Sequence, residues 1–434
     1  MSTLIDVMKS IRPLQLLLFL VVWSHGAIAA SQGSEALKPL TVLEAINEAL
    51  AKNPEIAVLR ERLQSMRARA KQAPYLEDPE ISIQFGGVPL ANPTNLSRAD
   101  SNMFGIRQKF PFFGKLGLKE KIALQEAKIM EEELRAKERE IISRVKMVYA
   151  ELFMVQKEIE ILREQLEIMR GIIRATEARY QVGKVTQQDV FKALLEQSQI
   201  MNQHILAEEE RKTSEVRLNA LLNRPPQTPM EIPSDLAVPR LSLTRAGLEE
   251  MALANRPELR GAERGIERAE RMYELADRNR KFPDFMLGWD YWWMPTDEMT
   301  KNRYGAMVNI TIPFSPWTLG KRNYEVEETL AESRVAKAEW DAVRNMTLRE
   351  IGESWAKVQA GQRSEELYRE GILSQADLSF RAAMTAYQTG RAEFVNLLEA
   401  QRALREARMG YYRAMVGLVQ SMADLERAVG KDLP

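Results

Sequence analysis

The sequence predicts a mainly α-helical protein that also supplies strands to a transmembrane β-barrel, arranged as two tandem helix–strand–strand–helix repeats. Three observations support this: a composition rich in Ala, Leu, Glu, Arg and Lys, two very long stretches with helical periodicity, and motifs that occur twice in the same order. The 434 residues include 61 basic and 61 acidic side chains. This balance gives no long-range attraction to nucleic acid, so we expect no nucleic-acid partner.

Residues 1–30 are typical of a secretory signal peptide. Lys9 and Arg12 form a basic start, the apolar run PLQLLLFLVVW follows, and AIAA offers cleavage after Ala29 or Ala30. A transmembrane anchor is the alternative reading. The apolar run has roughly ten residues, however, whereas a membrane-spanning helix needs ~20.

The sequence has no cysteine and only two histidines, of which His25 lies in the signal peptide. Disulfides and a lipid anchor on an N-terminal cysteine are excluded, so we expect no N-terminal lipid anchor. Zinc sites and Cys–His catalytic pairs therefore lack most of the residues that they require. We expect His204 to be a solvated surface side chain. We predict no enzymatic activity, no metal and no cofactor, because the carboxylates recur at helical ion-pair spacing from Lys and Arg.

Several motifs recur about two hundred residues apart. EALAKNPEI at 48–56 returns as MALANRPEL at 251–259, and Pro54 and Pro257 both suit the first turn of a helix. The proline-rich stretch LNRPPQTPMEIP cannot continue a helix and separates the copies. We place the first repeat at 31–226 and the second at 227–434.

Two long helices determine the predicted architecture. Residues 115–180 contain no proline, and a helix of that length spans roughly 100 Å. From Val145 to Ile173 its apolar residues alternate at spacings of three and four, which is a coiled-coil seam. The second copy, from about 321 to 387, has matching length. We expect the return arms 186–223 and 393–430 to pack against them.

Four segments alternate apolar and polar residues, at about 80–88, 102–110, 284–294 and 303–313. Such segments, with aromatic residues near their ends, suit a transmembrane β-barrel; a soluble sheet packed on helices is the alternative. Four strands cannot close a membrane barrel, and open edges are not tolerated in lipid. If the strands enter a membrane, the chain must therefore assemble, giving eight strands as a dimer or twelve as a trimer.

A similar bend follows each long helix, in YQVGK and YQTGR. Glycine adopts the left-handed conformation that a sharp helix end requires. The residues that the two bends share by identity or charge, and that we select as candidate site residues, are Tyr180, Gly183 and Lys184 in the first and Tyr387, Gly390 and Arg391 in the second.

The signal peptide, the duplicated unit, the Pro-Glu helix starts and the YQVGK bends together resemble the outer-membrane factor family of TolC-like exit ducts. The resemblance implies a homotrimer with a twelve-stranded barrel in the outer membrane of a Gram-negative-type envelope and a twelve-helix tunnel in the periplasm. It also implies a passive duct that contacts outer-membrane lipid, a periplasmic adaptor and an inner-membrane pump of the RND type. RQKFPFFGKLGLK at 107–119 resembles members serving heavy-metal efflux.

The resemblance also implies roles at the two bends, which would form the periplasmic tip, both gate and docking surface. Asp189 and Tyr387 match positions that link neighbouring coils and hold the tip shut. Glu399 matches one position of an inner acidic ring, whereas the second ring position is Asn396. A bracing arginine is replaced by Ala392, next to Arg391. The alternative is that these are ordinary solvated helix residues.

Two other functions remain open at this stage. An exit duct for type I protein secretion would use the same architecture. A soluble periplasmic coiled-coil scaffold would carry the strands as a small sheet. Sequence alone does not identify the exported substrate.

Overall fold

The computed structural model describes residues 39–297, 299 and 301–433, so the predicted signal peptide lies outside the described residues. From Leu40 onward the chain forms one compact unit. The first repeat contains α1 (Val42–Lys52), α2 (Pro54–Gln72), β1 (Glu80–Gly86), a 3-10 turn (Leu96–Arg98), β2 (Ser101–Phe110), α3 (Lys115–Gln181) and α4 (Gln187–Leu221). The second contains α5 (Arg245–Asn255), α6 (Pro257–Lys281), β3 (Asp284–Trp293), β4 (Asn302–Thr311), α7 (Leu319–Leu367), a π turn (Tyr368–Ile372), α8 (Leu373–Gln388) and α9 (Phe394–Val429). The predicted mainly α-helical fold with two tandem helix–strand–strand–helix repeats is confirmed.

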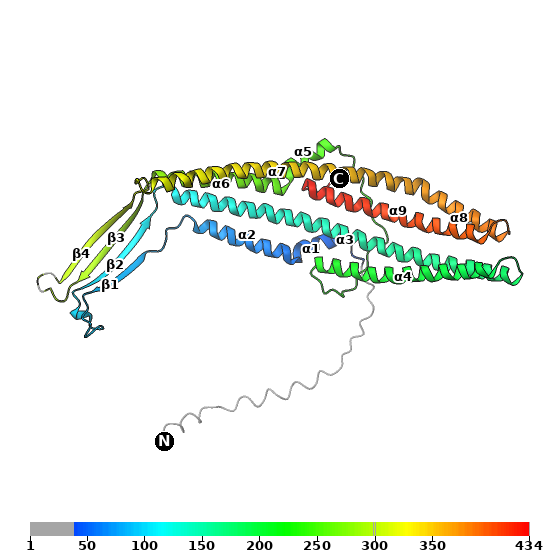
Figure 1. The fold of residues 1–434 in the computed structure, drawn as a ribbon, viewed down its shortest axis with the longest axis horizontal. Helices are drawn as coiled ribbons and strands as arrows, with labels where there is room; N and C mark the ends of the chain where they lie inside the picture. Colours follow the sequence, from blue (N-terminus) through cyan, green and yellow to red (C-terminus); the bar gives the residue numbers. More distant parts are fainter. Residues whose placement is uncertain (1–38, 298, 300, 434) are drawn as a thin grey trace, which may run out of the picture. The chain divides into compact units, whose positions relative to one another are not determined.

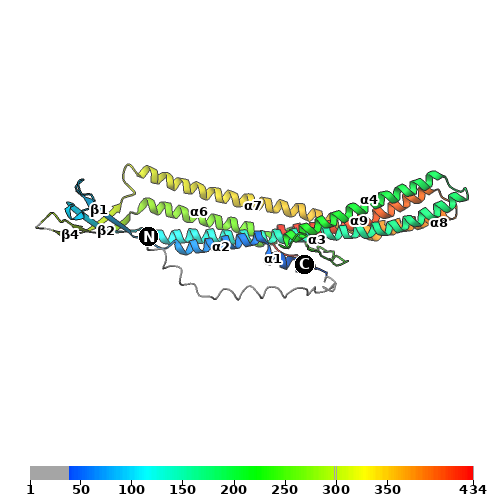
Figure 2. The same cartoon turned by 90° about the horizontal axis from the view of Figure 1, so that it is seen from below.

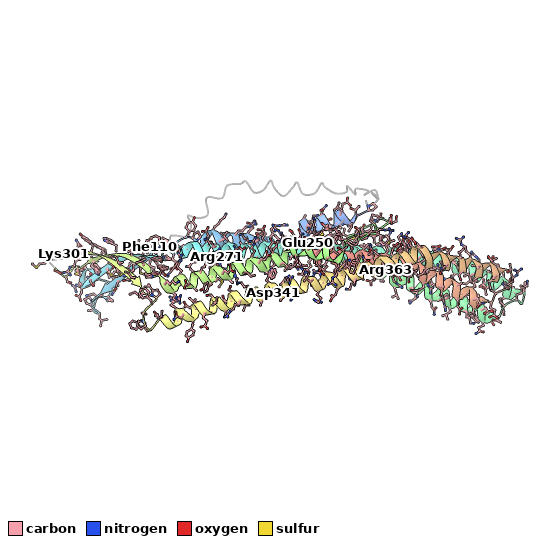
Figure 3. All side chains as sticks on the ribbon, turned by 90° about the horizontal axis from the view of Figure 1, so that it is seen from above. Phe110, Glu250, Arg271, Lys301, Asp341 and Arg363 are labelled. Carbon is pink, nitrogen blue, oxygen red and sulfur yellow. The ribbon has the colours of Figure 1, made fainter. Side chains whose placement is uncertain are left out.

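The four strands form one antiparallel sheet in the order β1-β2-β3-β4, beyond the ends of the long helices (Figure 1). The repeats meet inside this sheet, because β2 pairs with β3, with Ile106 opposite Trp289 and Gly105 opposite Asp290. Lys301 marks the outer end of the sheet and Phe110 the end that joins the helices (Figure 3). Within the described residues, the outer edges of β1 and β4 have no strand beside them.

A buried lysine fixes the junction between sheet and helices. Lys115, the first residue of α3, is buried, and its Nζ donates to the Asp284 carboxylate and to the Phe282 carbonyl, both at 2.8 Å. Arg278 of α6 donates to the Phe113 carbonyl at 2.9 Å. The start of the first long helix is therefore held by residues of the second repeat.

The helix α3 lies between the two repeats. It packs against α2 and α4 of its own repeat and against α6 and α9 of the other, and α7 packs against α6 and α9 (Figures 1 and 2). The residues at spacings of three and four from Val145 to Ile173 are buried or half-buried, as the coiled-coil seam predicts. Three apolar clusters form the core: one around Tyr149, one around Ile351 in the equivalent part of the second repeat, and one around Met169 nearer the bends.

Pairs of shorter helices are joined end to end to cover the long ones. The buried Asn53 caps α2 by accepting from the Glu55 amide at 2.9 Å, and it donates to the Leu221 carbonyl at the end of α4 at 3.0 Å. In the second repeat, α9 ends at Gly430, whose backbone lies against that of Arg256 at the start of α6. Each long helix thus has continuous neighbours.

The expectation of an uninterrupted second long helix is wrong in one detail. The π turn at Tyr368–Ile372 separates α7 from α8, whereas α3 is regular throughout its 67 residues. A π turn has i→i+5 hydrogen bonds and therefore holds about one residue more than a regular α-helical turn. The sequence periodicity does not reveal it because apolar residues continue on both sides.

The contact between Gly430 and Arg256 gives a stability prediction. Gly430 has φ of 79°, and a Cβ there would lie 2.9 Å from Arg256 Cα. We expect Gly430→Ala to lower the free energy of unfolding by about 2 kcal/mol, from the left-handed conformation and the clash. Gly417→Ala is the matched control, since a Cβ at Gly417 meets no atom within 4 Å and alanine favours a helix by up to ~1 kcal/mol. Denaturant unfolding in detergent measures both; equal midpoints would contradict the prediction.

Candidate functional site

Both bends end their helices in the same way. Gly183 and Gly390 have φ of 70° and 78°. The Gly183 amide donates to the Tyr180 carbonyl, and the next amide, of Lys184, donates five residues back to Arg179 at 2.9 Å. Gly390 and Arg391 repeat this pattern, with Arg391 donating to Ala386 at 2.8 Å. This is the Schellman arrangement, in which glycine is favoured because its φ is positive.

Tyr387 joins the two bends. Its side chain is 1% exposed, and its hydroxyl lies 3.0 Å from the Thr176 hydroxyl of α3. The Arg179 guanidinium stacks 4.6 Å from the centre of the Tyr387 ring and donates to the Tyr387 carbonyl. Phe394, at the start of α9, meets the same ring edge to face. Tyr180, the counterpart of Tyr387 in the first bend, is half-exposed.

A buried carboxylate connects α4 to α9 farther from the bends. Glu196 is 1% exposed and accepts from Arg402 Nε at 2.9 Å and from Arg405 at 3.0 Å. Burial alone raises the pKa of Glu196, but the hydrogen bonds and charges of Arg402 and Arg405 outweigh burial and hold the pKa below its ordinary value. Glu196 is therefore an anion at neutral pH.

A second polar contact lies inside the apolar seam. Gln401 of α9 donates to Gln165 of α3, and both side chains are fully buried. The contacts of Tyr387, Glu196 and Gln165 all cross from the first hairpin, α3–α4, to the second, α8–α9. Together they connect the hairpins at two levels, near the bends at Tyr387 and farther away at Gln401 and Arg402, and we call them the inter-hairpin contacts.

The other predicted site residues are placed differently. Asp189 caps α4, accepting from the Thr186 amide at 3.1 Å and from its hydroxyl at 2.9 Å. Asn396 and Glu399 are exposed on α9, and Lys184 and Arg391 are exposed at the bends. Within the described residues, no hydrogen bond joins Asp189 to Tyr387. The single chain therefore brings Tyr387 to Thr176 and Arg179 instead.

The inter-hairpin contacts include residues that the sequence did not indicate. Thr176, Arg179, Glu196 and Arg402 lie within ordinary helical patterns, and their partners are about two hundred residues away. Only Tyr387 belongs to a repeated motif. Arg179 was detectable in part, because it is basic and adjacent to the first bend, one residue before Tyr180.

Nothing in the described part of the chain forms a metal-binding cluster of three or more His, Cys, Asp or Glu residues. His204 is not fully solvated as expected: it is half-buried, and its Nε2 accepts from Arg163 Nε at 3.1 Å. Among the described helices, none combines enough length with enough apolar character to cross a membrane.

The Glu196 contact predicts a pH dependence. A carboxylate with a lowered folded-state pKa stabilises the fold at neutral pH, and this contribution is lost as the pH falls through the folded pKa. We expect Glu196→Gln to lower the free energy of unfolding at pH 7 by about 1–3 kcal/mol, because Arg405 loses its buried partner. The difference from the native protein should shrink below pH 4.5, the ordinary pKa of a glutamate. Denaturant titrations of the variant and the native protein, at pH 7 and below pH 4.5, measure this difference. A difference in unfolding free energy that does not depend on pH would contradict the prediction.

The chain matches known proteins over most of its length. The model of a family described as outer membrane efflux protein matches residues 45–224 and again 248–431. Among curated proteins, the chain is 22% identical over 259 residues to the cobalt-zinc-cadmium resistance protein CzcC of Cupriavidus metallidurans. That match covers 59% of this chain and 60% of the relative, less than two thirds of its length.

Several solved structures share the fold. CusC superposes with a TM-score of 0.77 at 18% identity, covering 91% of this chain and 93% of the other. The outer membrane protein VceC of Vibrio cholerae superposes with a TM-score of 0.74 at 20% identity, covering 91% and 97%. The family and its structural neighbours are channel proteins and not enzymes. With the family model matching both helical hairpins and all four strands in two successive copies, the chain belongs to the outer membrane efflux protein family.

Proposed function

We propose that the chain is the passive exit duct of a tripartite efflux system and that it acts as a homotrimer. The observation that carries the proposal is the four-stranded sheet, apolar on one face and open at both edges, joined directly to the long helical hairpins. In this arrangement the sheet lies in the outer membrane and the helices extend through the periplasm, where an adaptor and an inner-membrane pump dock.

The two faces of the sheet support a membrane location. One face carries large exposed apolar side chains from all four strands, including Ile81, Phe104, Trp289 and Val308. The other face carries polar or small residues at the same levels, such as Ser82, Gly105, Asp290 and Gly305. Outward apolar and inward polar alternation is the pattern of a membrane barrel with an aqueous interior.

Exposed aromatic residues lie where the sheet meets the helices. Phe113 is 85% exposed and Trp317 is 86% exposed, in the turns before α3 and α7. Aromatic girdles occupy the interfaces of membrane barrels because their rings suit the boundary between lipid and water. These two residues therefore indicate the level at which the barrel leaves the membrane.

The lateral helices support assembly. The helix α4 exposes a row of apolar residues, and so do α7 and α8 on the other side of the chain. The residues concerned are Phe191, Leu195, Met201, Ile205 and Leu206 on α4, and Leu330, Val335, Leu367 and Leu378 on α7 and α8. Exposed apolar surface of this extent indicates a protein interface. A ring of three chains covers both rows, pairs β1 with β4 of the next chain and gives twelve strands.

The domain organisation follows the repeats. We assign the first repeat to 31–226 and the second to 227–434, in keeping with the two separate family matches. Each repeat supplies one strand hairpin to the barrel and one helical hairpin to the tunnel.

We infer that the exported substrate is a heavy-metal ion, delivered by an RND-type pump. This rests on the likeness to the cobalt-zinc-cadmium resistance protein and on the motif at 107–119. The second candidate function is an exit duct for type I secretion, which would use the same fold. None of the reported matches favours it.

The tip residues are assigned to gating and docking. In the trimer, Asp189 and Tyr387 contribute to contacts that hold the tip closed, and Glu399 forms an acidic ring with Asn396 beside it. The exposed Tyr180, Lys184 and Arg391, around Gly183 and Gly390, form the docking surface. The inter-hairpin contacts hold each pair of hairpins together behind this ring.

Assembly is tested by mass. We expect the chain, expressed with its leader, to fractionate with the outer membrane and to give a trimer mass in mild detergent by light scattering after subtraction of the detergent. Strand closure in lipid requires the additional strands. A periplasmic monomer or dimer would overturn the duct proposal and favour the soluble scaffold.

The gate is tested by conductance. We expect Asp189→Ala together with Glu399→Ala to raise single-channel conductance in planar bilayers severalfold, because both anions are removed from the closed tip. Gln199→Ala, at an exposed position of α4, is the control. Unchanged conductance in the double variant would mean that these side chains are ordinary solvated residues.

A further inference from the structure

The junctions between sheet and helices carry the same short motifs in both repeats. A proline followed by an acid begins the first strand of each repeat, at 79–80 and at 283–284, which are 204 positions apart. A glycine followed by a lysine lies at the start of each long helix, at 114–115 and at 320–321, which are 206 positions apart. The repeats therefore supply two equivalent lysines and two equivalent acids: Lys115 and Lys321, and Asp284 and Glu80.

One lysine and one acid already meet within the chain. Lys115 is 4% exposed, and its Nζ donates to the Asp284 carboxylate and to the Phe282 carbonyl, both at 2.8 Å. This contact crosses the boundary between the repeats, because Lys115 follows β2, Asp284 begins β3, and β2 pairs with β3. It fixes the start of a long helix to the strand that lies beside that helix's own hairpin.

The equivalent residues of the other junction are left open. The Lys321 side chain is 76% exposed, and its printed ion-pair partner is Glu325 of the same helix, at 3.9 Å. Glu80 is exposed, and within the described residues its carboxylate has no hydrogen bond or ion pair, since the opposite residue, Arg107, pairs with Asp290 at 3.6 Å. The strands β1 and β4 are the two edges of the sheet, roughly 14 Å apart at about 4.8 Å per strand. Lys321, which follows β4, therefore has no access to Glu80 of its own chain.

The two open edges carry opposite charges at this level. The β1 edge begins with EDPE at 77–80, which holds three carboxylates. In the described part of the chain, only the first of them has a lysine within ion-pair distance, at 3.4 Å. On the β4 edge, α7 begins with Lys321 and with Arg322, which is paired with Glu325 at 2.7 Å. Opposite charges on the two edges favour a head-to-tail ring of identical chains, in which each acidic edge meets a basic one.

We propose that Lys321 pairs with Glu80 of the next chain, as the between-chain equivalent of the contact between Lys115 and Asp284. The start of α7 is thus fixed by a second copy of the protein, whereas the start of α3 is fixed within the chain. The turn before α7 is longer than the turn before α3, 312–318 against 111–114, so the pair joins the same two elements at a different angle. The proposal rests on the proposed homotrimer, which would contain three such pairs.

Charge reversal in the full-length protein in mild detergent tests the pair. We expect Lys321→Glu alone and Glu80→Lys alone each to lower, by several degrees, the temperature at which the trimer mass is lost, because like charges then meet at all three edges. The double variant should recover most of the loss, because opposite charges meet again in exchanged positions. Lys121→Glu is the matched control: Lys121 is exposed at the start of α3, which has helices of its own chain on both sides.

The absence of cysteine from the sequence allows a second, independent test. We expect Lys321→Cys combined with Glu80→Cys to be joined by a short bifunctional thiol reagent into dimers and trimers on a denaturing gel. Lys321→Cys combined with Gln84→Cys is the control. Gln84 lies on the same face of β1, roughly 13 Å farther along the strand, and should give at least fivefold less of the joined species.

The outcomes separate the pair from the duct. A native trimer that tolerates both single reversals, a double variant whose losses add, or equal joining of the two cysteine pairs would each overturn the pair and leave the duct standing. A native protein that is monomeric would overturn both. Rescue by the double reversal together with selective joining at Glu80→Cys supports the pair.

Discussion

The requirement to cover the 67-residue helix α3 along its whole length governs the structure. A helix of about 100 Å has more apolar surface than any one of its shorter neighbours covers. The chain meets this requirement with helices joined end to end, α4 with α2 and α9 with α6. The joints at Asn53 and Arg256 are therefore as important as the apolar seam. The duplication, the return arms and the Pro-Glu starts all serve this arrangement.

Much of the fold follows from local sequence rules. Proline at the first helical turn, glycine at the bends and the spacing of three and four from Val145 to Ile173 each act within a few residues, so the sequence alone indicates them. Strand alternation is equally local, and the register of β2 with β3 places Ile106 and Trp289 on one face as the pattern implies. The repeated motifs then indicate the order of the elements, even though the sequence does not show how the elements pack.

The candidate site was less predictable because its contacts are distant in sequence. Thr176 and Tyr387 are 211 positions apart, and nothing near Thr176 marks it as a partner. Glu196 and Arg402 resemble the many solvated charges around them until packing buries the carboxylate. The π turn was hidden for another reason: one added residue leaves the apolar character of the helix intact and appears only when the two repeats are counted against each other.

The pairing of β2 with β3 bears on how such a chain arose. Because the repeats meet edge to edge within the sheet, the internal junction has the same antiparallel strand geometry that the proposed trimer would require between chains. An ancestor with a single repeat would have completed the ring as six identical copies. Fusion of two copies released each half from the need to remain identical to the other. The Asp189 cap is then a specialisation of the first half, and the π turn is a specialisation of the second.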